Sequence, residues 1–476
     1  MSFVRPLLCG ALSLALLLSS CATPITPPDL RGIYQIAAQQ ADEDRNPVVL
    51  IPGILGSRIE ARDGTQIWGA FSGRYADPSD DDGARSIALP MARGVPLDQL
   101  RHDHIAPGAL DRVQIRFLGL PIVMQAYAQI LGVLGVGGYR DEEIGRAGGV
   151  DYGDDHYTCF QFAYDWRRDL VENARILAAY LDDREAYVRR EHAARGRDAD
   201  GPIRFDIVAH SMGGLVLRYY LRYGTADLPA DGSLPELTWA GAKRVSRAIM
   251  IGTPNAGSVD ALRILTEGHS IGPFLPRYKP ALLGTMPAVY QLLPRGRHGW
   301  IYDRHGDSIE DLLSFQLWKE NGWGLADPEN DRELARLLPD VEDPAERRAI
   351  ALDHLEKVLA RAAAFQAALD RPAKRPEGLE IILFAGDAID TPETVEVGSG
   401  RDPFRVTGYG RGDKVVLRSS ALMDERPETD RTMTLVSPVD WSQVFFLFTE
   451  HLEMTRDPVF ADNLLYLLLE APRGAE

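Results

Sequence analysis

Apolar runs bounded by turn residues recur along the chain and predict a series of buried strands. The strongest runs are Pro47–Ile51, Thr158–Tyr164, Phe205–Ala209, Val245–Ile251 and Leu379–Phe384. Two shorter runs, at Lys414–Leu417 and Thr432–Leu435, predict further strands. Short apolar runs of this length, bounded by turn signals, are typical of strands in the core of a sheet.

Apolar residues at helical spacing separate these strands. They predict helices at Leu30–Gln40, Gln125–Val136, Glu172–Arg190, Ile309–Lys319, Glu346–Leu369 and Pro458–Leu469. Strands that alternate with helices are typical of a mainly parallel sheet with helices on both faces. The sequence therefore predicts an α/β fold, and no internal repeat interrupts it.

The first residues have the pattern of a targeting segment. Arg5 precedes the apolar run Leu7–Leu18, which is short for a membrane span, and Ser19-Ser20-Cys21 follows. This end resembles a bacterial lipobox, in which the cysteine is lipidated and becomes the mature N-terminus. A plain cleaved signal and an uncleaved anchor are the alternatives. The resemblance implies a location in the bacterial cell envelope, and Ala22 fits sorting to the outer membrane.

This pattern divides the chain into three parts. We expect a signal peptide at residues 1–20, a lipidated tether at 21–46, and an α/β domain at 47–476. Two stretches rich in turn and polar residues, at about 61–150 and 258–376, are expected to be cap or lid insertions in that domain.

Composition narrows the partners and the chemistry. The 476 residues contain 52 Lys and Arg against 69 Asp and Glu, a net charge of −17, which argues against nucleic acid and against docking on anionic lipid by charge alone. Of three cysteines, only Cys159 lies in the body of the chain, so no internal disulfide is expected. We expect Cys159 to be a buried apolar residue. No spacing of Cys and His suggests a metal site, and no cofactor is predicted.

A strand–turn–helix pattern surrounds Ser211. The predicted strand Phe205–Ala209 leads into His210-Ser211-Met212-Gly213-Gly214, and an apolar helical stretch follows. This order matches the nucleophile elbow G-x-S-x-G, with Ala209 at the first glycine position. The flanking residues must be small because strand and helix pass very close together. We therefore predict that Ser211 is a nucleophile beside a helix N-terminus that stabilises negative charge.

A serine nucleophile needs a histidine base and an orienting carboxylate, and both follow the serine along an α/β-hydrolase chain. His451 is the histidine after the last predicted strands and is the predicted base, while His210 is expected to support the turn. Four other histidines lie in the long insertion: His269, His298, His305 and His354. One turn offers Asp387 or Asp390 as the acid and another offers Asp413, and spacing alone does not decide between them.

Short segments in a fixed order carry a family resemblance. They are Pro47–Glu60 (PVVLIPGILGSRIE), Tyr164–Arg167 (YDWR), Ala209–Gly214, Gly252–Ser258, Met286–Pro294, Gly412–Ser419 and Glu450–Asp457 with Asn463–Leu468. Together they resemble the lecithin:cholesterol acyltransferase family, which includes a lysosomal phospholipase A2 and many bacterial members. The resemblance implies an α/β-hydrolase fold and covers most of the chain after the tether.

The resemblance also implies roles for individual residues. It implies that Ser211 is the nucleophile, Asp413 the orienting acid and His451 the general base. It implies that the backbone N–H groups of Ile54 and Met212 form the oxyanion hole. For Met212, the nucleophile elbow predicts the same role independently, because the residue after the nucleophile supplies one donor.

The predicted activity is acyl transfer from a lipid ester through an acyl-serine intermediate. The acyl group passes to water or to another alcohol, and both acceptors use the same catalytic residues. Tethering at Cys21 would place the site at a membrane surface. A carboxylesterase or triacylglycerol lipase is the alternative enzyme. A non-catalytic binding protein of the cell envelope is the alternative from another class.

The sequence says less about the residues that contact the substrate. Trp68, Phe71 and the run Phe117–Val123 could line an acyl groove or face a membrane, and packing inside a cap is an equal alternative. Ser258–Pro280 contains glycines and prolines that suit a mobile lid. Vertebrate members brace a lid with a disulfide, but Ile59–Ser72 contains no cysteine, so lid behaviour does not transfer from them.

Overall fold

The computed structural model describes residues 26–39, 45–69, 75–109, 127–270, 276–398, 403–426 and 433–472. It also describes the backbone of two paired strands, Arg112–Phe117 (β5) and Leu120–Gln125 (β6). The predicted signal peptide, Cys21 and Phe71 lie outside the described residues. The side chains of Phe117–Val123 do so as well.

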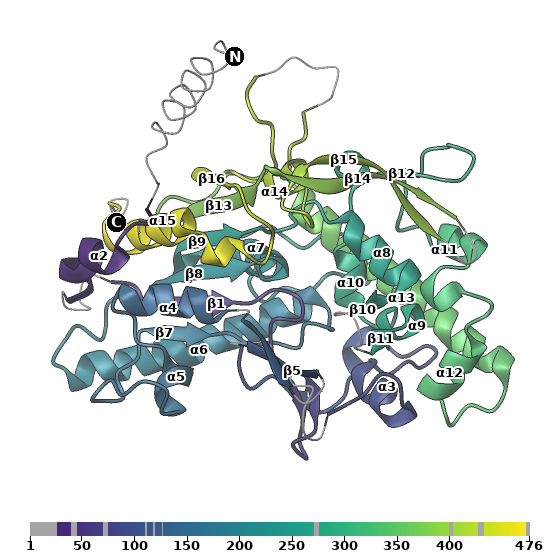
Figure 1. The fold of residues 1–476 in the computed structure, drawn as a ribbon, viewed down its shortest axis with the longest axis horizontal. Helices are drawn as coiled ribbons and strands as arrows, with labels where there is room; N and C mark the ends of the chain where they lie inside the picture. The colour runs from purple at the N-terminus through teal and green to yellow at the C-terminus, as the bar shows by residue number, and fades with distance from the viewer. Residues whose placement is uncertain are drawn as a thin grey trace, which may run out of the picture.

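A six-stranded parallel sheet forms the centre of the molecule (Figure 1). Its strands are Val48–Ile51 (β1), Cys159–Gln161 (β7), Phe205–His210 (β8), Val245–Ile251 (β9), Glu380–Gly386 (β13) and Gln443–Leu447 (β16). The order across the sheet is β16-β13-β9-β8-β1-β7, and every neighbouring pair is parallel. The predicted α/β class is confirmed.

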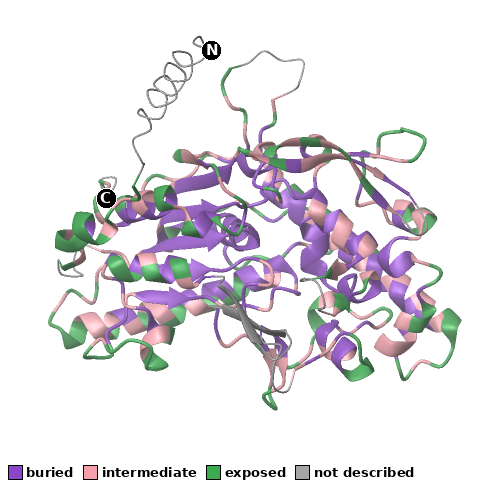
Figure 2. Cartoon of the chain, viewed as in Figure 1, coloured by how far each residue is buried: buried purple, intermediate pink, exposed green. Residues whose placement is uncertain are grey.

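Helices cover both faces of this sheet. They are Ala128–Val136 (α4), Leu170–Ala194 (α6), Met212–Tyr223 (α7) and Pro458–Leu469 (α15). Successive strand residues point to opposite faces. Val49 and Ile51 therefore pack with α6 and α7, whereas Val48 and Leu50 pack with α4 and α15. Figure 2 shows most of the sheet as buried: β1, β7 and β8 are buried throughout, whereas the edge strand β16 is fully buried only at Leu447.

Residues between β1 and β7 build one set of additional elements. These are Ile59–Ala61 (β2), Gln66–Trp68 (β3), Asp81–Ile87 (α3), His104–Ile105 (β4), the pair β5 and β6, α4, and Glu142–Arg146 (α5). A short 3-10 turn, Leu97–Gln99, precedes β4. Helix Leu30–Gln39 (α2) lies outside this set and contacts α15, where the Tyr34 hydroxyl donates to Asp462 Oδ1 at 2.8 Å.

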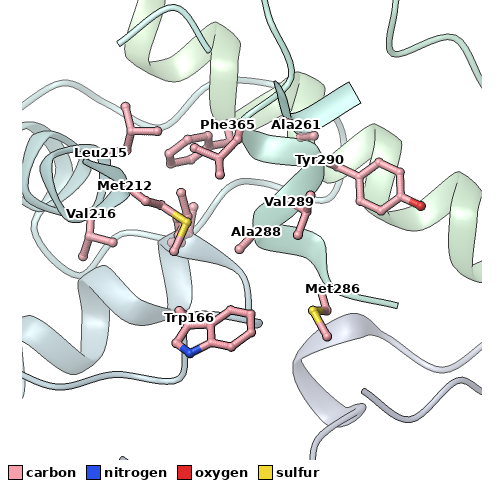
Figure 3. Close-up of a cluster of buried hydrophobic side chains, with 14 of the residues drawn as sticks. Trp166, Met212, Leu215, Val216, Ala261, Met286, Ala288, Val289, Tyr290 and Phe365 are labelled. Atoms are coloured by element: carbon pink, nitrogen blue, oxygen red, sulfur yellow. The ribbon is translucent and has the colours of Figure 1, made fainter. Parts of the chain in front are cut away.

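Residues between β9 and β13 build the larger set. Its elements are Val259–Glu267 (α8), His269–Ser270 (β10), Arg277–Tyr278 (β11), Pro280–Leu283 (α9), Pro287–Gln291 (α10), Trp300–Tyr302 (β12), Phe315–Asn321 (α11), Asp331–Leu337 (α12) and Pro344–Asp370 (α13). Figure 3 shows side chains of α8, α10 and α13 meeting Met212, Leu215 and Val216 of α7. The insertion therefore packs directly on the helix that follows Ser211.

The last third of the chain departs from the sequence-based prediction. A long hairpin, Ile389–Val397 (β14) and Phe404–Gly412 (β15), follows β13, and helix Arg418–Leu422 (α14) comes next. The predicted strand at Lys414–Leu417 is wrong, because the Asp413 carboxylate accepts the Val415 and Val416 N–H groups and closes a turn there. The prediction at Thr432–Leu435 is also wrong for its described part, Met433–Leu435, and the strand of this region is β16.

Candidate active site

Ser211 occupies a sharp turn between β8 and α7. Its backbone has φ 53° and ψ −127°, a left-handed conformation that costs a residue with a side chain. The turn is held because the Ser211 N–H donates to the carbonyl of Ile251 at 2.7 Å. A Cβ atom on Gly214 would lie 2.1 Å from Thr253 Oγ1, which explains why that position needs glycine. The geometry is that of a nucleophile elbow.

Three predicted residues meet at the carboxyl edge of the sheet. His451 Nε2 lies 2.9 Å from Ser211 Oγ, and His451 Nδ1 lies 2.7 Å from Asp413 Oδ2. A carboxylate only accepts hydrogen bonds, so Nδ1 carries a proton and the Nε2 lone pair faces the serine hydroxyl. Ser211 and His451 are each 7% exposed and Asp413 is 1% exposed. This is the arrangement that a serine–histidine–aspartate triad requires.

Asp413 reaches this edge through the β14–β15 hairpin. The hairpin leaves the sheet after Gly386 and returns so closely that a Cβ atom on Gly386 would lie 2.5 Å from Asp413 Cβ. Asp413 Oδ1 accepts the N–H groups of Val415 at 3.0 Å and Val416 at 2.6 Å, which leaves Oδ2 for His451. The His451 N–H also donates to the Asp413 carbonyl at 2.9 Å. Asp413 and His451 are thus connected by one side-chain and one backbone hydrogen bond.

The alternative acids pair elsewhere. Asp387 Oδ2 lies 4.0 Å from Arg418, and Asp390 Oδ1 lies 2.9 Å from Arg411 in an exposed pair. Neither contact involves His451, whereas Asp413 does contact it. The structure therefore favours Asp413 among the three acids that the sequence offered.

The other histidines of the insertion have separate surroundings. His298 Nε2 lies 3.3 Å from Glu425, His354 Nε2 donates to the carbonyl of Thr285 at 3.0 Å, His269 lies in β10 and His305 lies in an exposed turn. Among the five histidines that follow the elbow, His451 is the one whose ring nitrogen contacts Ser211 Oγ.

The turn after β1 lies directly against the nucleophile. A Cβ atom on Gly53 would lie 2.8 Å from Ser211 Cβ, so the next residue, Ile54, follows at the edge of the site. The Gly56 N–H donates to the Gly53 carbonyl at 3.0 Å and closes the turn. On the other side, Met212 is the first residue of α7, where N–H groups lack partners within the helix. Ile54 thus follows a residue that lies against Ser211, and Met212 follows Ser211 directly in the chain.

Trp68 packs against the turn after β1 and binds its backbone. Its indole N–H donates to the carbonyl of Leu55 at 2.8 Å, and Leu55 itself has φ 62°. Trp68 is buried and makes edge contacts with Trp166 at 5.4 Å and Tyr278 at 5.8 Å between ring centroids. The structure thus places Trp68 in the packed wall behind the turn. Of the predicted lid, it describes α8, β10 and β11, and residues 271–275 lie outside the described residues.

A buried ion pair lies beside the same edge. Arg167 is 1% exposed and pairs with Asp165 at 2.7 Å. Burial would raise the pKa of Asp165, but the charge and hydrogen bonds of Arg167 outweigh burial and lower it. Arg167 also donates to the carbonyls of Ser86 and Ile87 at 3.0 and 2.9 Å. The pair therefore fastens the segment after β1 to the end of β7.

Sequence reasoning missed Tyr127. Its buried hydroxyl accepts the Gly53 N–H at 2.7 Å and lies 3.0 Å from His210 Nδ1. His210 Nε2 lies 3.3 Å from the His451 carbonyl. Burial, together with the nearby His451, lowers the pKa of His210 to about 3. No sequence signal marks Tyr127, which enters from the insertion before β7, whereas His210 adjoins Ser211.

Among the described residues, no group of three or more His, Cys, Asp or Glu side chains could hold a metal ion. No helix in the described part of the chain is both long and apolar enough to cross a bilayer. Cys159 is buried, and burial raises the pKa of its thiol.

The parallel sheet with Ser211 at a strand–helix elbow defines an α/β-hydrolase. A model of the lecithin:cholesterol acyltransferase family matches residues 150–321, which contain the elbow and much of the larger insertion. The protein is thus an α/β-hydrolase similar to that family, and the match supports acyl transfer or hydrolysis of lipid esters. A sequence search of curated proteins finds no match.

Two solved structures are similar to the chain over most of its length. A chain of the Tle4–Tli4 complex is 13% identical with a TM-score of 0.49, over 89% of this chain and 98% of that chain. EstA from Clostridium botulinum is 11% identical with a TM-score of 0.33, over 95% of this chain and 93% of that chain.

Proposed function

We propose that the protein transfers acyl groups from lipid esters through an acyl-Ser211 intermediate. The observation that carries the proposal is the hydrogen-bonded series from Ser211 Oγ through His451 to Asp413, at 2.9 and 2.7 Å. The family match over residues 150–321 supports a lipid ester as the acyl donor. Without His451 as a base, the serine hydroxyl would be a poor nucleophile near neutral pH.

The proposed reaction has two half-reactions. Ser211 Oγ attacks the ester carbonyl carbon while its proton passes to His451 Nε2, and the Ile54 and Met212 N–H groups stabilise the oxyanion. The bond to the leaving alcohol then breaks, and that alcohol takes the proton from His451. Water or a second alcohol attacks the acyl-serine in the same way. This second half-reaction releases a fatty acid or a new ester, and His451 returns the proton to Ser211 Oγ.

The test has two parts, labelling and product analysis. A fluorophosphonate probe is expected to label the wild-type protein and not the Ser211→Ala variant. The purified chain that begins after Cys21 is then given mixed phospholipids with and without a sterol. Release of free fatty acid indicates hydrolysis, and formation of a new ester indicates transfer. Absence of labelling in the wild type contradicts the catalytic proposal, and labelling without turnover of any lipid contradicts the substrate class.

We also propose that Cys21 carries a lipid and holds the protein in the bacterial envelope, in the outer membrane. The support is the apolar run Leu7–Leu18 followed by Ser19-Ser20-Cys21 and Ala22. Cells fed radiolabelled palmitate are expected to label the wild type, and the Cys21→Ser variant is expected to lose both the label and membrane fractionation. Equal labelling of the two proteins contradicts the proposal.

A further inference from the structure

Tyr127 and His210 form a hydrogen-bonded connection between the two halves of the candidate site. It runs from the Gly53 N–H through the Tyr127 hydroxyl and the His210 ring to the backbone carbonyl of His451, with distances of 2.7, 3.0 and 3.3 Å. The turn after β1, Gly53–Gly56, carries the proposed donor Ile54 and is called the oxyanion turn below. We infer that this series positions the oxyanion turn relative to His451, and that Tyr127 and His210 are positioning residues for the reaction. The inference rests on the proposed function of Ser211 and His451.

The direction of every hydrogen bond in the series is fixed by its ends. A backbone N–H at Gly53 only donates, so the Tyr127 oxygen accepts it and its own proton is free to be donated. That proton goes to His210 Nδ1, which must therefore be unprotonated. The neutral ring then carries its proton on Nε2 and donates it to the His451 carbonyl, which only accepts. One tautomer of His210 satisfies the whole series, whereas the other leaves an unprotonated Nε2 facing the His451 carbonyl, which cannot donate.

Burial keeps this arrangement in a single protonation state. Tyr127 is 4% and His210 2% exposed. Burial and the neighbouring His451 lower the pKa of His210 to about 3, and burial raises the pKa of Tyr127 well above its usual value. The His210 ring lies 5.0 Å from the His451 ring between centroids. A neutral His210 is therefore required for His451 to gain a proton during the reaction without facing a second cation.

Tyr127 holds the oxyanion turn at both of its ends. Its hydroxyl binds the Gly53 N–H, one residue before the proposed donor Ile54. At the other end of the turn, a Cβ atom on Gly56 would lie 2.8 Å from both Tyr127 Cε2 and the Tyr127 hydroxyl. The turn therefore rests on the tyrosine ring, and the hydroxyl fixes the peptide that precedes Ile54. Loss of the hydroxyl frees that peptide without removing the ring.

The variant that isolates this contact is Tyr127→Phe. Turnover of a soluble ester is expected to fall about 10- to 100-fold with little change in KM, because only transition-state stabilisation depends on the exact position of the Ile54 N–H. The rate of fluorophosphonate labelling is expected to fall in parallel. The matched control is Tyr219→Phe on α7, in which another buried tyrosine loses a hydroxyl bond of 3.1 Å, to the Ala226 carbonyl. The control is expected to keep wild-type turnover.

A spectroscopic measurement tests the tautomer directly. In protein with ¹⁵N-labelled histidine, His210 is expected to show an unprotonated Nδ1 and a protonated Nε2, and to stay neutral as the pH is lowered to 5. The His210→Gln variant identifies its signals. Wild-type turnover in Tyr127→Phe, or a His210 proton on Nδ1, overturns the inference. Absence of fluorophosphonate labelling in the wild type overturns the proposed function instead, so the two failures are distinguishable.

Discussion

At the scale of single residues, Ser211 has a strained backbone conformation that its hydrogen bonds and buried neighbours hold in place. A left-handed conformation costs a residue with a side chain about 1–3 kcal/mol. The surrounding contacts offset this cost, because the Ser211 N–H is bonded to Ile251 and every residue of α7 is buried. The strain presents Oγ to His451 Nε2 at 2.9 Å. The position of Ser211 Oγ beside His451 therefore depends on the rigidity of the elements that flank the serine.

The assignment of the acid is testable at the same scale. Asp413→Asn is expected to lower turnover about 10³- to 10⁴-fold, because an amide cannot hold the imidazole in the required tautomer or stabilise its charged form. The asparagine oxygen can still accept the Val415 and Val416 N–H groups, so the turn is expected to persist. Asp387→Asn is the matched control and is expected to retain wild-type turnover. Initial rates on a soluble ester decide the matter, and a larger loss in the control would assign the acid to Asp387.

At the scale of elements, the approach of α7 to the end of β1 sets the geometry of the site. A Cβ atom on Gly213 would lie 2.5 Å from the Pro52 carbonyl oxygen and 2.8 Å from that of Ile51. Both atoms belong to the backbone, so they cannot rotate away as a side chain would. The close contact therefore fixes the position of α7 relative to the turn after β1.

Gly213→Ala is expected to lower stability by about 1–3 kcal/mol and to reduce turnover, because the added methyl group displaces the turn that carries Ile54. The control is Gly135→Ala in α4, where a Cβ atom meets nothing within 4 Å. That change is expected to raise helix stability by up to about 1 kcal/mol and leave turnover unchanged. Urea unfolding and ester hydrolysis measure both effects. Unaltered turnover in Gly213→Ala would show that the turn adjusts freely.

Local sequence patterns predicted correctly those strands and helices that one continuous segment of apolar or periodic residues specifies. Val245–Ile251 matches β9 and Pro458–Leu469 matches α15, because a continuous apolar run and a helical period specify them. The hairpin β14–β15 was missed because neither strand contains a continuous apolar run, and because glycines interrupt β15. The two acid-bearing turns could not be separated by spacing, since the hairpin brings Asp413 back beside Gly386. Tyr127 could not be found because its contacts are made only after folding.

At the scale of the whole molecule, buried neutral histidines link stability to pH. Burial lowers the pKa of His354 to about 4, and that of His210 to about 3. In the unfolded chain these groups bind protons near their usual pKa of about 6.5. The unfolded state then binds more protons than the folded state between about pH 6.5 and 4, so stability is full above this window and falls as the pH is lowered through it.

The His354→Gln variant tests this link. For wild type, His354 alone is expected to contribute a loss of about 2 kcal/mol in unfolding free energy between pH 6.5 and 4.5. Glutamine can still donate to the Thr285 carbonyl that His354 Nε2 contacts at 3.0 Å, but it does not titrate. The variant is expected to lose correspondingly less stability over the same window. Urea unfolding at the two pH values gives the comparison, and equal losses in both proteins would contradict it.

The β14–β15 hairpin returns the chain to the edge of the sheet that it has just left. The chain leaves the sheet at Gly386 and comes back at Gly412, one residue before Asp413. Strand β14 pairs with β15 from Ile389 opposite Gly412 outward to Val397 opposite Phe404. The outer half of β14 also pairs in parallel with β12, from Trp300 opposite Thr394 to Tyr302 opposite Glu396, so the insertion between β9 and β13 holds the far end of the hairpin. A change in the larger insertion would therefore have to keep the strand edge that β12 offers to the hairpin carrying Asp413.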